Sequence, residues 1–175
     1  MAEGPDDQIV VASLGIMTSA TIPRKILDAY HGRTILITGG RGYIGSALTQ
    51  SLAGINCKLI LLDQSPGDVW WPEEQTADIL LLNGDVSAQQ SWSDALPGVD
   101  YVFHLAAKEY FYRSEYDPEQ DLQFNALPVL HLLEVCRLQS YRPKIVFASS
   151  ANLFGLADTL PVNEDNRDNP LTMWA

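Results

Sequence analysis

The sequence predicts an α/β fold built on a doubly wound parallel sheet, and two observations support that prediction. Apolar runs of strand length alternate with helical patterns along most of the chain. The runs are apolar throughout rather than at every second residue, which is typical of strands buried on both faces of a parallel sheet. Alternating strands and helices favour a sheet covered by helices on both sides. The predicted strands are 33–38, 58–63, 78–82, 100–104 and 144–148.

Length and composition limit the classes of protein that this chain can represent. Its 175 residues, 46% of them hydrophobic, are enough for one domain with a real core. A net charge of -11 and the lack of any Lys/Arg cluster argue against nucleic-acid binding. No apolar run reaches the ~18 residues of a membrane span, and the N-terminus is acidic where a secretion signal is basic. Cys57 and Cys136 are expected to be buried thiols in a reducing compartment, so the protein is predicted to be soluble and cytoplasmic.

Residues 1–32 precede the first strand and are predicted to form an N-terminal extension to the domain at 33–175. A short helix is predicted over 21–32, with Thr21 as N-cap, Pro23 in the first turn and Gly32 as the stop. Two interpretations stay open for this segment, a surface appendage or a contact with another subunit.

The first strand runs into the sequence Gly-Gly-Arg-Gly-Tyr-Ile-Gly at 39–45, and a helix is predicted over 46–53. Gly40, Gly42 and Gly45 match the Gly-x-Gly-x-x-Gly dinucleotide fingerprint, in which the glycines allow a tight turn and close approach to a pyrophosphate. The N–H groups and dipole of the helix start favour a negatively charged group there. We therefore expect a dinucleotide pyrophosphate at the helix start after Gly42. A strand–turn–helix unit that binds nothing is the alternative.

The second strand ends at Asp63, 18 residues after Gly45 and close to the ~20 typical of the acid that accepts the adenosine ribose hydroxyls. A carboxylate there repels a 2′-phosphate, which favours NAD over NADP. Arg41, in the glycine loop, keeps NADP open as an alternative.

Two features of the remaining chain are informative. Trp70 and Trp71 lie in a turn-rich loop, where they either cover the sheet edge or grip a partner or an adenine ring. A helical stretch over 87–96 stops at a Pro-Gly pair, and a longer one covers 118–139 with Pro118 in its first turn. Pro128 predicts a kink or break near Asn125. The apolar face of that helix is predicted to include Leu122, Leu130, Leu133 and Cys136.

From about Thr34 to its last residue the chain resembles the extended short-chain dehydrogenase/reductase family, and within it the NAD-dependent sugar-nucleotide epimerases and dehydratases. That resemblance implies a Rossmann-type fold that is incomplete at its C-terminus relative to the family. The motifs that carry it are 38–45, Asp63, 84–86, His-Leu-Ala-Ala at 104–107, Asn125, 147–155 and Pro-Val-Asn-Glu at 161–164.

The resemblance also implies roles for individual residues. Asp85 and Val86 would meet the adenine, the three residues after His104 would form a floor under the cofactor, and Asn125 would organise the broken helix. Alternatives stay open, with Asp85 as a turn residue and Asn125 as a helix-breaking polar group. Ser150 aligns with the catalytic serine, and His104 is expected to be buried structure rather than a base. The implied NAD site comprises Gly39, Arg41, Gly42, Tyr43, Ile44, Gly45, Asp63, Asp85, Val86, Leu105, Ala106, Ala107 and Asn125.

The chain departs from the family pattern near its end. Trp174 occupies the place of the family's catalytic tyrosine, and the position of the partner lysine lies beyond Ala175. Two functions therefore stay open: the NAD-binding portion of an enzyme acting on a nucleotide sugar, or a non-catalytic NAD-binding or scaffold module. The intact protein is expected to be an enzyme, whereas the 175-residue chain alone is expected to bind NAD without turnover. The fifth predicted strand is apolar, and this chain supplies no further strand to cover its open edge. We therefore also predict that the isolated chain forms homo-oligomers or aggregates.

Overall fold

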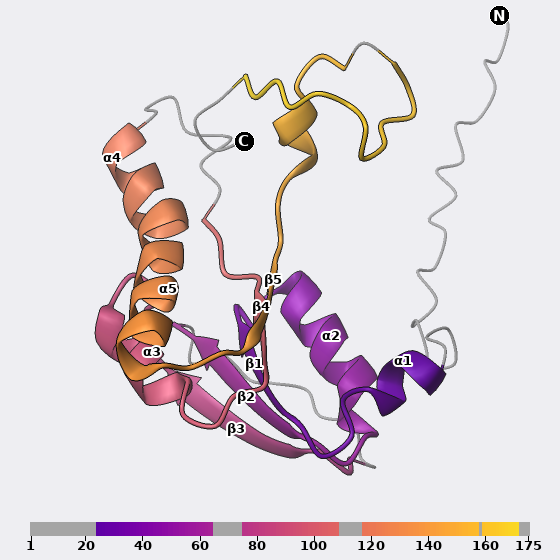
Figure 1. Ribbon diagram of the computed structural model, residues 1–175, viewed down its shortest axis with the longest axis vertical. Coiled ribbons are helices and arrows are strands. Elements are labelled where there is room, and N and C mark those ends of the chain that lie inside the picture. The colour runs from indigo at the N-terminus through magenta and orange to yellow at the C-terminus, as the bar shows by residue number, and fades with distance from the viewer. Residues whose placement is uncertain (1–23, 65–74, 109–116, 158, 172–175) are drawn as a thin grey trace, which may run out of the picture.

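The computed structural model describes residues 24–64, 75–108, 117–157 and 159–171, and its strands form one parallel sheet (Figure 1). The five strands lie in the order β3-β2-β1-β4-β5. This order reverses between β1 and β4, so a crevice opens where the carboxyl ends of these two neighbours meet. The prediction of a doubly wound parallel sheet is confirmed. The strands are β1 Thr34–Thr38, β2 Lys58–Asp63, β3 Asp78–Asn83, β4 Tyr101–His104 and β5 Lys144–Phe147.

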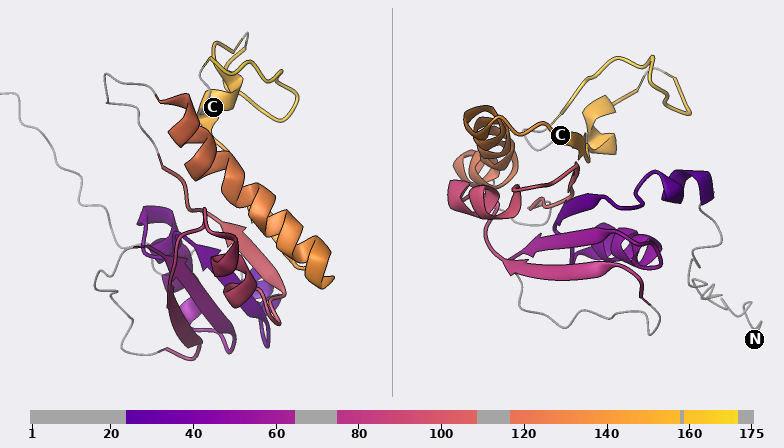
Figure 2. Two further views of the ribbon diagram at one scale, coloured as in Figure 1. Left: turned by 90° about the vertical axis from the view of Figure 1, so that its left-hand side faces the viewer. Right: turned by 60° about the horizontal axis from the view of Figure 1, so that its bottom comes forward.

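Helices cover both sides of the sheet (Figure 2). On one face, Ile35 and Ile37 of β1 pack in a core with Leu52 of helix α2 (Tyr43–Ala53). On the other face, Leu36 packs in a core that includes Trp92 of helix α3 (Gln89–Ala95) and residues of helix α5 (Leu127–Gln139). Successive side chains of a strand point to opposite faces, so an apolar run fills both cores.

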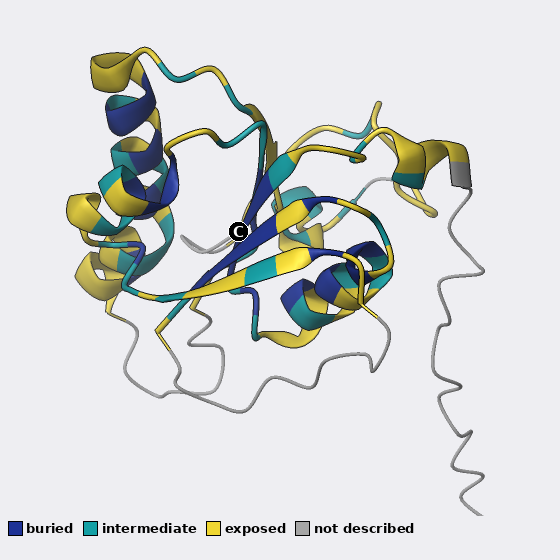
Figure 3. Ribbon diagram, turned by 90° about the horizontal axis from the view of Figure 1, so that it is seen from below, coloured by how far each residue is buried: buried dark blue, intermediate teal, exposed yellow. Residues whose placement is uncertain are grey.

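Burial falls from the centre of the sheet to its edges (Figure 3). Residues 35–38 of β1 and 59–62 of β2 are all buried. The expectation that every strand is buried on both faces is wrong for β3 and β5. Within the described part of the chain these edge strands have a neighbour on one side only, and the two cores centre on β1 and β2. On β5, Ile145, Val146 and Phe147 are 38%, 47% and 55% exposed.

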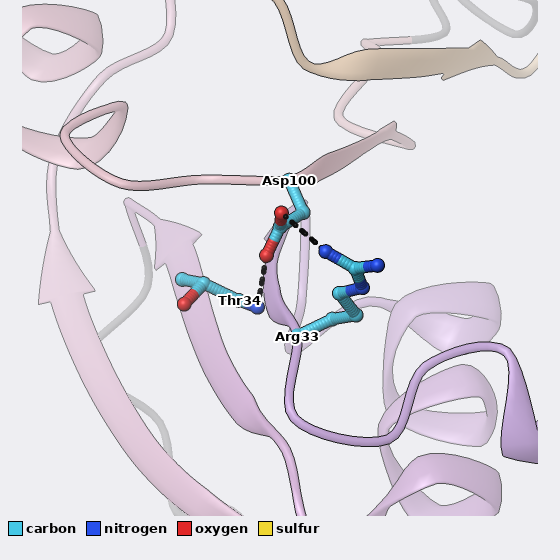
Figure 4. Close-up of polar contacts among 3 residues, drawn as sticks. All are labelled: Arg33, Thr34 and Asp100. Atoms are coloured by element: carbon cyan, nitrogen blue, oxygen red, sulfur yellow. Dashed lines mark hydrogen bonds and ion pairs between the residues drawn. The ribbon is translucent and has the colours of Figure 1, made fainter.

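Asp100 aligns the start of β4 with the start of β1 (Figure 4). Its Oδ2 accepts a hydrogen bond from the backbone N–H of Thr34 at 2.9 Å, and its Oδ1 accepts one from Nη1 of Arg33 at 3.2 Å. The ion pair with Arg33 is exposed and contributes little by itself. The bond to the Thr34 backbone fixes the register at which β4 joins the sheet.

The segment before β1 packs on the sheet. Helix α1 (Arg24–Asp28) falls inside the predicted helix, and Gly32 follows it at a φ of 70°. The Tyr30 ring packs edge-on against Tyr101, with 5.1 Å between centroids, and 6.1 Å from Phe103. These contacts join the segment to β4. Residues 1–23, with the proposed cap, and the tryptophan pair at 70–71 lie outside the described residues.

The long helix between β4 and β5 is broken, as Pro128 predicts. It consists of α4 (Pro118–Asp121), a π-helical turn η2 (Leu122–Ala126) and α5. Pro128 has no N–H to donate to the carbonyl of Phe124, and the N–H of Leu127 bonds instead to Leu122 five residues back. Pro118 occupies the first turn, as predicted.

The predicted apolar face of this helix is wrong for three of its four residues. Leu122, Leu130 and Leu133 are exposed, and only Cys136 is buried. Two stripes at helical spacing compete in this sequence, and the one at 128, 132, 135 and 136 packs on the sheet. Cys57 and Cys136 are both free and buried, as expected. Among the described residues, no helix has the length and apolar character that crossing a membrane requires.

Candidate functional site

A cavity of about 380 Å³ lies at the carboxyl ends of the central strands, where the strand order reverses. Its walls come from the loop between β1 and α2, the ends of β2 and β4, the start of the loop after β3, and one aromatic residue of η2. The residues that line it are Gly39, Arg41, Gly42, Leu62, Asp63, Gln64, Gly84, Asp85, Val86, Leu105, Ala106, Ala107, Lys108 and Phe124.

The glycine loop forms one wall of the cavity. Gly39 has a φ of 64°, and a Cβ there would lie 3.0 Å from the backbone of Ala106, so a side chain is excluded by conformation and by space. A Cβ on Gly45 would overlap the carbonyl oxygen of Gly39. Gly42 is the N-cap of α2, and no side chain caps this helix. The first-turn N–H groups therefore remain available to an anion.

Asp63 and Arg41 lie beside each other at the mouth of this loop. Oδ2 of Asp63 accepts a hydrogen bond from the backbone N–H of Arg41 at 3.0 Å. The Arg41 guanidinium is unusual, because its Nε and Nη1 atoms are buried and neither has a hydrogen-bond partner among the described residues. A buried donor without an acceptor is unfavourable. This wall of the cavity thus presents an acceptor and an unsatisfied cation together.

Asp85 is a turn residue that also lines the cavity, and its role toward an adenine stays a prediction. It lines the cavity, and its Oδ1 accepts the backbone N–H of Ser87 at 2.7 Å in a tight turn. Burial tends to raise the pKa of its carboxyl group. Hydrogen bonds from Ser87 and Gln64, together with the charge of Lys108, outweigh burial and lower the pKa below its ordinary value. Asp85 is therefore a carboxylate at neutral pH and can act as an acceptor.

Hydrogen bonds to Thr38 hold the backbone that forms the floor of the cavity. Its Oγ1 accepts the backbone N–H groups of Leu105, at 3.1 Å, and Ala106, at 3.2 Å, and lies 2.7 Å from Nδ1 of His104. Burial lowers the pKa of His104 to about 4, so the ring is neutral at physiological pH. The ring also packs edge-on against Trp92, with 5.4 Å between the ring centroids. His104 is therefore a buried structural residue, as expected.

Asn125 acts on the cavity through Lys108. Its Oδ1 accepts the Lys108 N–H at 2.9 Å, and its Nδ2 donates to the Lys108 carbonyl at 3.0 Å and to Oδ1 of Asp121 at 2.6 Å. The Lys108 ammonium lies 4.2 Å from the centroid of the Phe124 ring. Asn125 of the π-helical turn thus holds the backbone of Lys108 in place after β4. The side chain of Lys108 provides a cation at the cavity wall.

The structure brings nine of the thirteen predicted cofactor residues to the cavity wall. Tyr43 and Ile44 are exposed on the first turn of α2, Gly45 packs under the loop, and Asn125 supports Lys108. Sequence reasoning missed Leu62, Gln64, Gly84, Lys108 and Phe124. Four of these adjoin predicted residues at strand ends, where the rule that ligands bind at carboxyl edges could have found them. The orientation of Phe124 depends on the π turn.

Ser150 lies at the same edge of the sheet but is not a residue of the cavity wall. Its Oγ accepts the backbone N–H of Asn152 at 3.1 Å and caps the 3₁₀ helix η3 (Ala151–Phe154). The role predicted for Ser150 toward a substrate oxygen stays a prediction. Trp174 lies outside the described residues.

Comparisons with known proteins agree on one family. Residues 35–175 match the model of the NAD dependent epimerase/dehydratase family. UDP-glucuronate 4-epimerase 1 of Arabidopsis thaliana is 27% identical over 171 residues, which are 91% of this chain and 38% of that protein.

Two solved structures show the same relationship. The chain is similar to an epimerase of Methanothermobacter thermautotrophicus, with a TM-score of 0.72, 33% identity and coverage of 86% of this chain and 45% of that one. It is also similar to the UDP-glucose 4-epimerase of Brucella ovis in complex with NAD, with a TM-score of 0.69, 27% identity and coverage of 82% and 43%. The chain spans less than half the length of each of these three proteins.

Proposed function

The chain belongs to the NAD-dependent epimerase/dehydratase family, and from that premise we propose that it is the NAD-binding portion of an enzyme that acts on a nucleotide sugar by hydride transfer. The cofactor of the family is NAD, as the sequence predicted. The observation that carries the proposal is the cavity at the switch point, whose walls join an uncapped helix start to two carboxylates and a floor of small residues.

The residues of the cavity fit the parts of NAD. The start of α2 suits the pyrophosphate, because its first-turn N–H groups are uncapped and Gly42 admits close approach. Asp63 suits the adenosine ribose, and Asp85 with Val86 suits the adenine. The floor at 105–107 has room for a flat group, since Thr38 holds its backbone close to the sheet.

When bound, NAD supplies a hydride acceptor and donor at the substrate carbon. This chain would bind and orient the cofactor, and Ser150 would hydrogen-bond the reacting sugar oxygen. The proposal of a nucleotide-sugar substrate draws on the family and on relatives named for UDP-glucuronate and UDP-glucose.

A non-catalytic NAD-binding module is the second candidate, and Trp174 favours it. An indole N–H can donate a hydrogen bond but cannot take up a proton near neutral pH. The two candidates share the NAD site and differ in turnover by the whole protein.

Titration calorimetry with NAD and NADP tests the shared part of both candidates. We expect the 175-residue chain to bind NAD more tightly than NADP, and Asp63→Ala to narrow the difference by removing a ribose acceptor that also repels a 2′-phosphate. Asp94→Ala is the matched control, because it removes an exposed carboxylate on α3. Equal affinity for both cofactors, unchanged by Asp63→Ala, would contradict the assignment of Asp63.

A further inference from the structure

Trp92 lies behind the wall of the cavity and is not one of the residues that line it. Its side chain is the largest fully buried one among the described residues, in a core that also contains Leu62 and Val86 of the cavity wall. A buried indole N–H requires an acceptor. Nε1 of Trp92 donates to the carbonyl oxygen of Val86 at 2.7 Å. The indole is therefore bonded to the backbone of a residue that a ligand in the cavity would touch.

This bond acts on the turn between β3 and α3. Within the turn, Oδ1 of Asp85 accepts the backbone N–H of Ser87 at 2.7 Å, which joins the carboxylate to the backbone locally. The indole adds a contact from helix α3 to the turn, across six residues. Without the indole, the buried carbonyl of Val86 would lose its donor, which is unfavourable. The turn would then shift to expose that carbonyl to solvent, and Asp85 would move with Val86.

The ring of Trp92 is itself held from the floor of the cavity. It packs edge-on against His104, with 5.4 Å between ring centroids. His104 lies 2.7 Å from Oγ1 of Thr38, which accepts the backbone N–H groups of the floor. Because the indole is packed on this side, its N–H keeps one direction and can hold the Val86 carbonyl in one place. Trp92 thus connects the floor of the cavity to the wall formed by Asp85 and Val86.

We propose that Trp92 is a positioning residue for recognition of a purine base, which it serves by holding Asp85 and Val86 where the cavity would meet the 6-position of an adenine. The inference rests on the proposed binding of NAD. Adenine has a donor at this position, its 6-amino group, and the Asp85 carboxylate is an acceptor. Hypoxanthine has an oxo group there, and a carboxylate repels that second acceptor. Discrimination between the two bases then depends on where Trp92 holds the turn.

Two dinucleotides test the proposal. Nicotinamide hypoxanthine dinucleotide differs from NAD only in that an oxo group replaces the 6-amino group of the purine, and both can be titrated calorimetrically into the 175-residue chain. We expect the unsubstituted chain to prefer NAD. Trp92→Phe keeps an aromatic ring against His104 but removes the N–H, so it should narrow the preference by roughly three- to tenfold, the range of one hydrogen bond. Most of this change should be a loss of affinity for NAD.

Val135→Ala is the matched control for loss of stability. Val135 is 2% exposed in the same core, lies on α5 and has no polar group that could bond the turn. Its substitution should lower the free energy of unfolding, measured in urea, and leave the ratio of the two affinities unchanged. If Trp92 only filled the core, Trp92→Phe would behave in the same way.

A spectroscopic measurement leaves Trp92 in place, so it keeps the test decisive if Trp92→Phe does not fold. Replacing Trp70, Trp71 and Trp174 with Phe leaves Trp92 as the only tryptophan, which can be labelled as 5-fluorotryptophan. Because Trp92 does not line the cavity, a ligand would reach it through Val86. We expect its ¹⁹F resonance to shift on saturation with NAD, and to shift less with the hypoxanthine dinucleotide. Equal shifts, or none, would contradict the proposal.

The calorimetric outcomes separate this inference from the proposed function. If the unsubstituted chain binds neither dinucleotide, both are overturned. If it binds the two dinucleotides equally, or if Trp92→Phe keeps the full preference for NAD, Trp92 does not position the purine wall, whereas the proposed NAD site stands. The same holds if Val135→Ala narrows the preference as much as Trp92→Phe, because loss of stability would then explain the change.

Discussion

The hydrogen bonds of Thr38 favour one tautomer of the neutral His104 ring. Because Oγ1 of Thr38 accepts two backbone N–H groups, its own hydrogen is left to donate to Nδ1 of His104. Nδ1 must then lack a proton, so the ring is neutral and carries its hydrogen on Nε2. A protonated ring would compete for Oγ1 as a third donor. The neutral state of His104 therefore holds the cavity floor in place.

This arrangement predicts a loss of stability in acid. The pKa of His104 falls from 6.5 to about 4 on folding, because burial disfavours the charged ring. Between these two values the unfolded chain binds a proton that the folded chain excludes, so the unfolding free energy falls as the pH falls. The loss is about 3 kcal/mol over the whole interval, at ~1.4 kcal/mol for each unit of pKa difference.

His104→Asn keeps an acceptor near the position of Nδ1 and removes the titration. We expect it to flatten the dependence of urea-unfolding free energy on pH between about 4 and 6.5. His31→Asn, at an exposed position, is the control and should keep the unsubstituted slope. If His104→Asn has that slope as well, another group causes the acid sensitivity.

Spacing in the sequence identified the glycine loop and Asp63 but not the state of the Arg41 side chain. Gly39 and Gly42 are predictable because a tight turn after a strand has few solutions. The isolation of Nε and Nη1 of Arg41 is not, since it depends on which residues from other segments surround the guanidinium. The cation of Lys108 was missed for a similar reason, because Asn125 and Phe124 position it from 17 and 16 residues away, respectively.

At the scale of elements, the break at Pro128 lets Asn125 connect a buried acid, Asp121, to Lys108 of the cavity wall. The π turn of η2 brings Asn125 within reach of both Lys108 and Asp121, and Asp121 is only 5% exposed. Its Oδ1 accepts the amide of Asn125 at 2.6 Å. Removing Asn125 takes this donor from a buried carboxylate and also releases the backbone of Lys108.

We therefore predict that Asn125→Ala lowers the unfolding free energy by about 1–3 kcal/mol, the cost of leaving a buried polar group unpaired. Asp121→Ala removes the carboxyl group that Asn125→Ala would leave without its donor. The unfolding free energy of the double variant should therefore fall by less than the sum of the two single-variant losses. Urea denaturation of the four chains measures this coupling, and additive losses would contradict it. Gln123→Ala, which removes an exposed amide from the same π-helical turn, is the control.

The position of this break could be predicted, but the face that packs on the sheet could not. Proline lacks a donor wherever it occurs, so Pro128 alone predicts a break in the turn before it. Leu130 and Leu133 have the same spacing and apolarity as buried residues, and only the docking of α5 with α3 on the sheet decides between the two stripes. Periodicity cannot rank two apolar faces of one helix.

At the scale of the whole molecule, the described part of the chain leaves apolar residues exposed at the β5 edge of the sheet, at the β3 edge and on one face of α5. Ile145, Val146 and Phe147 of β5 are open, and so are Leu130 and Leu133 of α5. An edge strand with unpaired backbone groups and apolar side chains is a template for association. We expect the isolated 175-residue chain to oligomerise or aggregate as its concentration rises.

Light scattering at increasing concentration tests this expectation. Val146→Lys should reduce association by placing a charge on the open strand, whereas Leu160→Lys, in an exposed segment outside the sheet, should not. A monomer at high concentration that unfolds cooperatively would contradict the prediction. Equal effects of the two substitutions would show that net charge, and not β5, controls association.

The ability of the isolated chain to catalyse hydride transfer is also a property of the whole molecule. Hydride transfer from a sugar carbon requires a group that takes the hydroxyl proton, and general acid–base help of this kind contributes ~10²- to 10⁴-fold, or about 3–5 kcal/mol of barrier. Ser150 can align that hydroxyl but cannot accept its proton at an ordinary hydroxyl pKa. His104 is buried, and its Nδ1 already accepts from Thr38. Trp174 has no basic atom to offer.

We therefore predict that the 175-residue chain binds NAD yet shows no measurable epimerase or dehydratase turnover of UDP-sugars. Trp174→Tyr alone should not restore turnover, because the 175 residues include no lysine four positions after 174, the spacing that the family resemblance implies. The measurement is product formation from UDP-glucose and UDP-glucuronate at saturating NAD, with NAD binding followed calorimetrically in the same preparation. Turnover that disappears in Ser150→Ala would contradict the prediction, and it would require a proton acceptor other than Trp174 and His104.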